Sequence, residues 1–292
     1  MIEWINNIFG IENDVSVPTL ISIIVFLVGG LTTYLFSQLR QFNDRKKTRK
    51  TVILLLNEIL KDLGTKELNT ADFHKTINTK HRASWFYPHK PISYLETLFE
   101  LDFNHIYYSF RTKFAWDFCS KKIKDKGFHR VWAALRNLRF MEEKLEKHIE
   151  NMMSRFNEYH NRYMECIENY RKAHDEFMRK TEGMHIPTSD QKVMDYIRAV
   201  DKIWVEWQKI DEKERTAYYN TYEKLVLPML KLNRNNSDVP FTAETDNLLL
   251  ACTHQYIEIE NTLKVYNRTF KTYYWNYRHH RKILEKCISL MK

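Results

Sequence analysis

The stretch Val17–Phe36, VPTLISIIVFLVGGLTTYLF, contains no charged residue. An α-helix needs about 20 apolar residues to cross the hydrocarbon core of a bilayer, so the sequence predicts a transmembrane helix over residues 17–37. A cleaved signal peptide is a weaker alternative, because it would carry basic residues before the apolar run rather than after it. A buried core helix is also weaker, because core helices seldom extend this far without a charge.

Charged residues differ in sign on the two sides of the predicted span. Glu3, Glu12 and Asp14 precede it without any Lys or Arg, and a cluster of basic residues follows it. Because the cytoplasmic flanks of membrane helices are enriched in Lys and Arg, we expect residues 1–16 to lie outside, at the membrane interface, and the chain after the span to lie in the cytoplasm. We expect the basic cluster to contact anionic lipid head groups. It consists of Arg45, Lys46, Lys47, Arg49 and Lys50.

Residues that favour turns are scarce. The 292 residues include six glycines and six prolines. Turns and strand connections depend on these residues, so the sequence predicts an all-α fold of long helices. A basic juxtamembrane helix over residues 38–63 would continue the span, which gives one helix of about 45 residues that ends before Gly64. We expect residues 64–292 to form one cytoplasmic all-helical domain that begins with a loop over residues 65–90.

Two long amphipathic helices are predicted in the cytoplasmic domain. The first runs from Val131 to about Thr181, after a break at Gly127, and is ended by Gly183 and Pro187. The second runs from about Thr242 to the C-terminus. The apolar positions of the first helix recur at spacings of three, four and seven, as expected for one buried face. They are Leu135, Leu138, Leu145, Ile149, Met152, Met153, Phe156, Tyr163, Ile167, Tyr170 and Phe177.

Shorter helices are predicted between these two. Thr188 and Gln191 fit a capping box at the start of a helix that contains Trp204 and Trp207. Pro228 is expected to interrupt the helix that follows, because proline lacks the backbone donor and clashes with the preceding turn.

Several classes of site are disfavoured by the sequence. Beyond the span only Gly64, Gly127 and Gly183 remain, so neither a phosphate-binding P-loop nor a dinucleotide-binding fingerprint can be formed. No HExxH pattern and no clustered Cys/His ligands occur, and the pair His279–His280 fits a solvated helix surface better than a metal site. We therefore expect no cofactor and no bound metal. The four cysteines lie far apart in the sequence, which suits reduced thiols in a cytoplasmic domain.

Small and hydroxyl-bearing residues follow one side of the predicted span. On a helical wheel they fall within a sector of about 80°. The candidate pore or span-interface residues are Ser22, Gly29, Thr33 and Ser37. Small residues at this spacing let membrane helices approach closely, and any channel would need several copies of the chain. The alternative is that Gly, Ser and Thr are present for no special reason, since they are common in membrane helices.

Aromatic and basic residues alternate along the predicted last helix. Exposed aromatic rings beside cations are typical of single-stranded RNA binding. The alternative, which the number of aromatic residues favours, is that most of them pack in the core or between subunits. The residues are Tyr256, Tyr266, Phe270, Tyr273, Tyr274, Trp275 and Tyr277, with Arg268, Lys271, Arg278, Arg281 and Lys282.

Arg155 and His160 on the first long helix form an Arg-x4-His pattern. Metal-independent cleavage of RNA needs a cation to stabilise the charged phosphorane and a group of near-neutral pKa to move protons, and Arg with His supplies both. The alternative is that both are ordinary surface or core-polar residues, because so short a pattern also arises by chance.

The Arg155–His160 pattern is typical of HEPN ribonucleases. Together with one N-terminal span and an all-helical cytoplasmic domain, it resembles the small membrane accessory proteins of type VI-B CRISPR systems. The resemblance implies a divergent HEPN-like domain and a homo-oligomeric pore in the bacterial inner membrane that enhances an RNA-guided CRISPR effector in antiphage defence. HEPN motifs usually carry a polar residue directly after the Arg. Phe156 occupies that position here, with Asn157 next, so we expect no nuclease activity.

Three functions are therefore considered. The first is a membrane effector whose spans form a pore under the control of the helical domain. The second is a membrane-anchored ribonuclease that uses Arg155 and His160, with RNA as the partner. The third is a tether or receptor that docks a partner at the bilayer without catalysing a reaction.

Overall fold

The protein is described by a computed structural model in which most of the described residues are helical. Among these residues 92% are in helices and none is in a strand, which confirms the predicted all-α class for this part of the chain. The structure describes residues 13–77, 87–110, 118–183, 191–215 and 217–291. Residues 1–12 and Thr188 of the predicted capping box lie outside these ranges.

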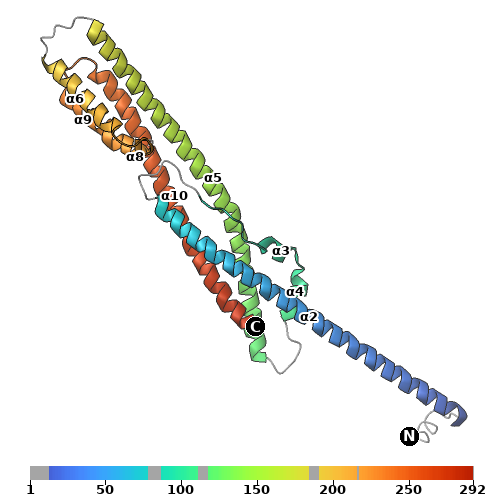
Figure 1. Ribbon diagram of the computed structural model, residues 1–292. Helices are drawn as coiled ribbons and strands as arrows, with labels where there is room; N and C mark the ends of the chain where they lie inside the picture. The colour runs from blue at the N-terminus through green and yellow to red at the C-terminus, as the bar shows by residue number, and fades with distance from the viewer. Residues whose placement is uncertain (1–12, 78–86, 111–117, 184–190, 216, 292) are drawn as a thin grey trace. The chain divides into compact units, whose positions relative to one another are not determined.

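Three helices are much longer than the others (Figure 1). They are α2 (Asn13–Ile77), α5 (Phe118–Gly183) and α10 (Thr242–Met291). The shorter elements are α3 (Leu95–Glu100), α4 (Phe103–Phe110), α6 (Gln191–Gln208), α7 (Glu212–Arg215), α8 (Tyr218–Thr221), the π-helical segment η2 (Tyr222–Val226) and α9 (Leu227–Asn235). The predicted start of the last helix at Thr242 is confirmed, and the first long helix extends to Gly183, where the described range ends.

Helix α2 does not end before Gly64, so the expected loop over residues 65–90 is wrong in its first part. A glycine inside a helix costs only about 1 kcal/mol relative to alanine, which packing readily offsets. The turns after Gly64 bury one side of the helix, at spacings of three and four residues. The buried residues are Lys66, Glu67, Thr70, Phe73 and Ile77.

Helix α5 continues through Gly127, so the predicted break there is wrong as well. Gly127 is buried where α5 meets α10, and a Cβ atom added to it would lie 3.7 Å from the Cβ of Leu290 and 3.8 Å from the carbonyl oxygen of Cys287. These are ordinary van der Waals distances. The helix is therefore held by its packing in spite of the low intrinsic propensity of glycine.

The chain divides into two compact units. The first contains the described residues of Met1–Ile59, Tyr94–Trp132 and Leu284–Lys292. Its core is aromatic: the ring of Phe128 lies 5.6 Å from those of Phe103 and Trp132, centroid to centroid, and Phe103 meets Trp132 at 5.2 Å. Aromatic pairs at these distances stabilise a core beyond the area they bury.

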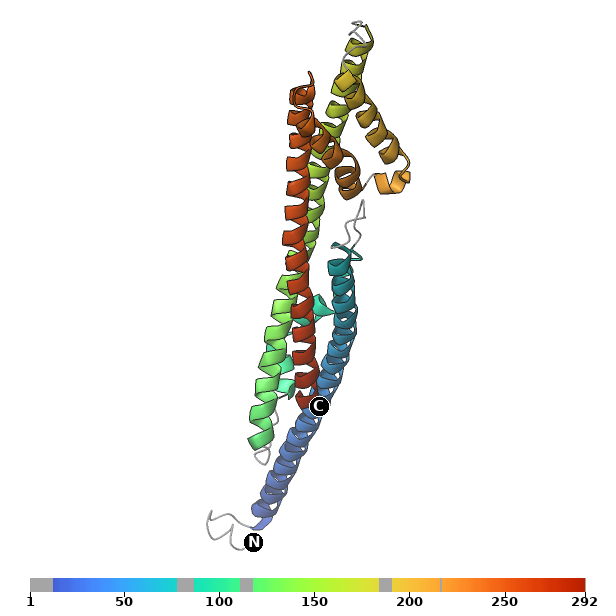
Figure 2. The same cartoon turned by 90° about the vertical axis from the view of Figure 1, so that its left-hand side faces the viewer.

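The second unit, Leu60–Ser93 and Ala133–Ile283, is built on α5 and α10, which lie side by side in Figures 1 and 2. The end of α2 joins them through Phe73, whose ring meets that of Phe270 on α10 at 4.7 Å. Helices α6 and α9 pair with each other, and Tyr196 donates a hydrogen bond of 2.9 Å to Asn233 between them. The apolar face predicted for α5 is buried at nine of its eleven positions, with Ile149 and Met153 half-buried.

Pro228 lies at the start of α9, directly after the π-helical segment η2. Proline removes a backbone donor and its ring clashes with the preceding turn, and a π-helical turn is one way in which a chain accommodates such a disruption. The predicted interruption is therefore present, although the segment before it also divides into α7 and α8.

Candidate functional site

The N-terminal part of α2 is apolar and unburied. Among the described residues, α2 is the one helix long and apolar enough to cross a membrane, and none of its most apolar window is covered by the rest of the chain. Contiguous apolar surface of this extent marks a contact with a membrane or another protein. The large exposed side chains are Ile21, Ile23, Ile24, Val25, Phe26, Leu27, Val28, Leu31, Tyr34, Leu35, Phe36, Leu39 and Phe42.

Hydroxyl groups within this segment bond to its own backbone. Ser22 donates to the carbonyl oxygen of Pro18, and Thr33 to that of Gly29, each at 2.8 Å. A bilayer core offers no water to a polar group, so internal partners of this kind suit a lipid environment. The predicted span-interface residues are all exposed, and a Cβ atom at Gly29 would have nothing within 4 Å. These four residues, Ser22, Gly29, Thr33 and Ser37, are therefore open to contact with lipid or a second helix.

The basic cluster follows this apolar segment on the same helix. Lys46, Lys47 and Lys50 are exposed, whereas Arg45 and Arg49 are half-buried. The order of apolar segment and cations along one helix fits a hydrocarbon core followed by its head-group layer.

Arg155 and His160 both lie on α5 but do not share a side of it. Five residues of helix separate them by about 140° around the axis. Arg155 is exposed, whereas His160 is half-buried with its ring stacked on that of Phe156 at 5.4 Å. Phe156, the apolar residue in the motif, is buried and also contacts Tyr218 of α8. The two residues thus differ in burial: one is open to solvent and the other packs on a core ring.

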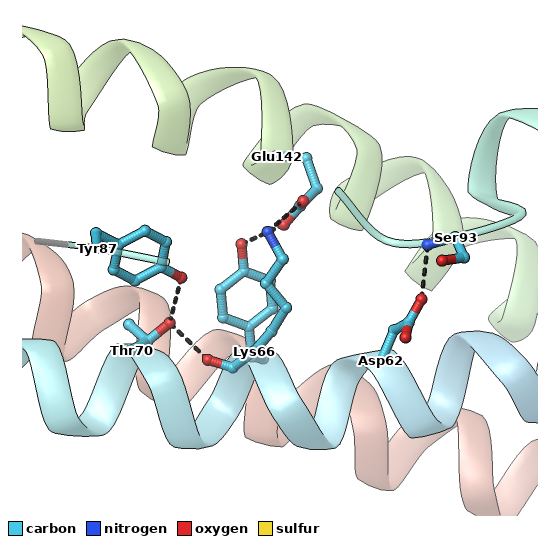
Figure 3. A network of polar contacts seen from close by, with 7 residues as sticks. Asp62, Lys66, Thr70, Tyr87, Ser93 and Glu142 are labelled. Carbon is cyan, nitrogen blue, oxygen red and sulfur yellow. Dashed lines mark hydrogen bonds and ion pairs between the residues drawn. The ribbon is translucent and has the colours of Figure 1, made fainter. Parts of the chain in front are cut away.

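A buried polar network that the sequence analysis did not predict lies in the second unit (Figure 3). Lys66 on α2 forms an ion pair of 2.7 Å with Glu142 on α5, and their side chains are only 4% and 12% exposed. Tyr277 on α10 donates a hydrogen bond of 2.5 Å to the other oxygen of Glu142. Burial raises the pKa of Tyr277 above its ordinary value, and the charge of Glu142 raises it further, so the hydroxyl remains a donor.

Further polar contacts lie on both sides of this pair. The Thr70 hydroxyl donates to the Lys66 carbonyl at 2.7 Å and lies 3.1 Å from the Tyr87 hydroxyl. One turn earlier, Asp62 accepts a hydrogen bond of 2.7 Å from the backbone N–H of Ser93. Burial raises the pKa of Tyr87 to about 12. The network thus joins α2, α5, α10 and the segment around Tyr87.

The sequence contains a partial signal of this network. Glu142 occurs within the apolar face of α5, between Leu138 and Leu145, where a charged residue needs a partner. Lys66 could not be matched to it, because the sequence predicted a loop there. The pattern of aromatic residues along α10 does not distinguish Tyr277 from its neighbours.

The aromatic residues of α10 separate into core and surface groups. Tyr266, Phe270, Tyr273 and Tyr277 are buried, which confirms the core alternative for these four. Trp275 is 52% exposed, so it remains available to a partner. Among the described residues, no group of three or more His, Cys, Asp or Glu is arranged to hold a metal ion.

Comparisons with known protein families, with curated proteins and with solved structures found no match.

Lys66→Met should destabilise the protein by about 3–5 kcal/mol, because it leaves the Glu142 carboxylate buried without its cation. Lys66→Met combined with Glu142→Gln should recover much of this loss, since a glutamine still accepts the Tyr277 hydrogen bond without a charge. The measurement is urea unfolding of the full chain in mild detergent, followed by circular dichroism. Lys75→Met, which removes a well-exposed partner of Asp72, is the control and should change little. Equal stability of the Lys66 and Lys75 variants would refute the role of the buried pair.

Purified full-length protein should leave labelled RNA intact in the presence of EDTA, because the apolar Phe156 occupies the motif position where HEPN sites carry a polar residue. Arg155→Ala should fold as wild type does, whereas His160→Ala should lower the thermal midpoint by removing the ring stacked on Phe156. Arg136→Ala, another exposed arginine on α5, is the matched control. RNA cleavage that disappears in both motif variants and persists in the control would establish the nuclease alternative.

Proposed function

We propose that this protein is a single-pass membrane protein in which the apolar part of α2 crosses the bilayer and the remaining helices lie in the cytoplasm. The observation that carries the proposal is the unburied apolar surface of α2 before the basic cluster. Each buried square ångström of apolar surface is worth about 25 cal/mol, so exposing a segment of this length to water would be very unfavourable. The cations after the segment favour the cytoplasmic location of its C-terminal side.

We propose further that copies of the chain associate through their spans and that the assembly permeabilises the membrane. One helix cannot enclose a path for ions, so this activity requires an oligomer. The uncovered stripe of Ser22, Gly29, Thr33 and Ser37 supports close helix contacts, because small residues let two backbones approach where lipid provides no hydrophobic driving force. Hydroxyl groups already bonded to the backbone can face either a neighbour or a lumen.

The resemblance to the accessory proteins of type VI-B CRISPR systems supports a role for this activity in antiphage defence. On this proposal the oligomer acts in the bacterial inner membrane and strengthens protection by an RNA-guided effector. The test is phage plating on cells that carry the effector alone, the membrane protein alone, or both. Protection that does not increase when the two are combined would refute the coupling.

A reporter fused after Lys292 should be active only in the cytoplasm. Replacing the five residues of the basic cluster with Glu should weaken or invert insertion, because Lys and Arg set orientation. The comparison uses alkaline phosphatase, active outside the membrane, and green fluorescent protein, active inside. Lys202→Glu with Lys231→Glu, on α6 and α9, is the control for added negative charge and should keep the wild-type orientation. External phosphatase activity of the wild-type fusion would contradict the proposed topology.

Gly29→Leu with Thr33→Leu should abolish dye leakage from vesicles while insertion is retained, because the larger side chains keep neighbouring spans apart. Ile24→Leu with Val28→Leu, on the opposite side of α2, is the matched control and should leak as wild type does. Leakage is measured at equal protein-to-lipid ratio, and oligomeric state by light scattering in mild detergent. A strictly monomeric wild-type protein, or full leakage by the Gly29/Thr33 variant, would rule out the pore.

A further inference from the structure

Helix α10 contains a long stretch without acidic residues. No Asp or Glu occurs between Glu260 and Glu285, whereas six Lys and Arg residues do. A solvated helix surface normally carries charges of both signs, so this stretch has an unusual excess of positive charge. Four of its cations are exposed to solvent. They are Lys264, Arg268, Lys271 and Lys282.

The exposed cations share one side of the helix with an exposed aromatic ring. At 100° per residue these side chains and two further ones fall within a sector of about 80°. We name this surface the basic face of α10. It consists of Lys264, Arg268, Lys271, Trp275, Arg278 and Lys282.

The end of α2 lies beside the basic face. Burial lowers the pKa of His74, and the charges of Lys271 and Lys75 lower it further, so these two cations lie near it. Acidic residues lie here too: Glu67 is 3.1 Å from Arg281 and 3.8 Å from Arg278, and Asp72 is 3.6 Å from Lys75. Arg281 balances Glu67 and Lys75 balances Asp72, so the positive excess of the basic face comes from its own cations.

Two exposed aromatic rings of this unit each lie against a cation. The guanidinium carbon of Arg278 is 5.5 Å from the centre of the Trp275 ring, which is 52% exposed. On α5 the ammonium of Lys144 is 4.3 Å from the centre of the Phe140 ring, which is 56% exposed. Water is a poor environment for such rings, whereas a flat base can stack on them while the cation meets a phosphate.

A hollow of about 300 Å³ lies between α5 and α10 and has Phe140 and Lys144 in its wall. This volume is at the lower end of the range for small-molecule sites and suits one ring rather than a large ligand. His148 and Tyr273 line it as well, with 2.9 Å between the imidazole Nδ1 and the phenol oxygen. Thr272, also in its wall, lies one turn after Arg268 and about 40° further around α10, so the hollow begins beside the edge of the basic face.

We propose that the basic face of α10 and the adjoining hollow bind single-stranded RNA. Phosphates would meet Arg268, Lys271 and Lys282, and bases would stack on Trp275 and enter the hollow beside Phe140. A duplex hides its bases, so it could use only the cations. An anionic bilayer could use the cations and the Trp275 ring as well, so the test below uses zwitterionic lipid to remove this alternative. The site is separate from the membrane function proposed above.

The test is fluorescence anisotropy of the full chain in nanodiscs of zwitterionic lipid, with a labelled unstructured RNA of about 16 nucleotides. The logarithm of affinity should fall with the logarithm of salt with a slope of about −3, since each phosphate contact of a single strand contributes about −0.7 and four exposed cations are present. Duplex RNA of equal length should bind at least tenfold more weakly, because its bases cannot stack.

Two sets of variants separate the roles of charge and ring. Arg268→Glu with Lys271→Glu should weaken binding about tenfold or more and make the salt slope shallower by about 1.4. Trp275→Ala and Phe140→Ala should each weaken binding about tenfold without changing the slope, because stacking releases no counterion. Both rings are exposed, so these variants should unfold as wild type does. If Trp275→Ala does not fold, Phe140→Ala alone tests the role of the rings.

Lys202→Glu with Lys231→Glu makes the same change in net charge on α6 and α9 and should leave RNA binding unaltered. The proposal is overturned if this control weakens binding as much as the basic-face variant. It is also overturned if duplex binds as well as single strand and both ring variants behave as wild type, which would indicate a surface for any polyanion. Anisotropy in nanodiscs does not depend on leakage, so failure here and failure of the pore are distinguishable.

Discussion

Apolar surface must leave water, and the helices of this protein satisfy that constraint in two ways. In the second unit α5 and α10 bury their apolar sides against each other and against the end of α2, as the contact between Phe73 and Phe270 illustrates. The N-terminal part of α2 has apolar residues around its whole circumference and no protein to cover them. The same helix therefore changes from a part that protein covers to a part that suits lipid, and the proposed function follows from that change.

Packing of apolar residues alone does not fix how three helices align. The ion pair of Lys66 with Glu142, completed by Tyr277, adds a constraint that apolar contacts lack, because sliding any helix by a turn would leave a charge buried without its partner. Glu67 and Arg281 make a second such contact between α2 and α10. In this respect the polar network selects one arrangement among several that would bury similar apolar area.

The sequence predicted the features that depend on local pattern. The all-α class, the long amphipathic α5 and the start of α10 at Thr242 all follow from composition and periodicity. Gly64 and Gly127 were misassigned as helix ends, because the packing that outweighs their low propensity involves residues distant in the chain. The ion pair of Lys66 with Glu142 could not be predicted for the same reason. The apolar segment of α2 can be found from the sequence alone, whereas the hollow beside Phe140 exists only when α5 and α10 lie side by side.

The position of the apolar segment at the start of α2 also affects the order of biosynthesis. In the proposed single-pass protein it leaves the ribosome well before α5 and α10, so membrane targeting can begin while the rest of the chain is untranslated. The end of α2 completes its packing only after α10 is made, since the amide of Asn267 reaches the carbonyl of His74 across 193 residues of sequence. Until then Phe73 can pack on Tyr87 but lacks Phe270, so the last turns of α2 are among the latest parts of the second unit to be finished.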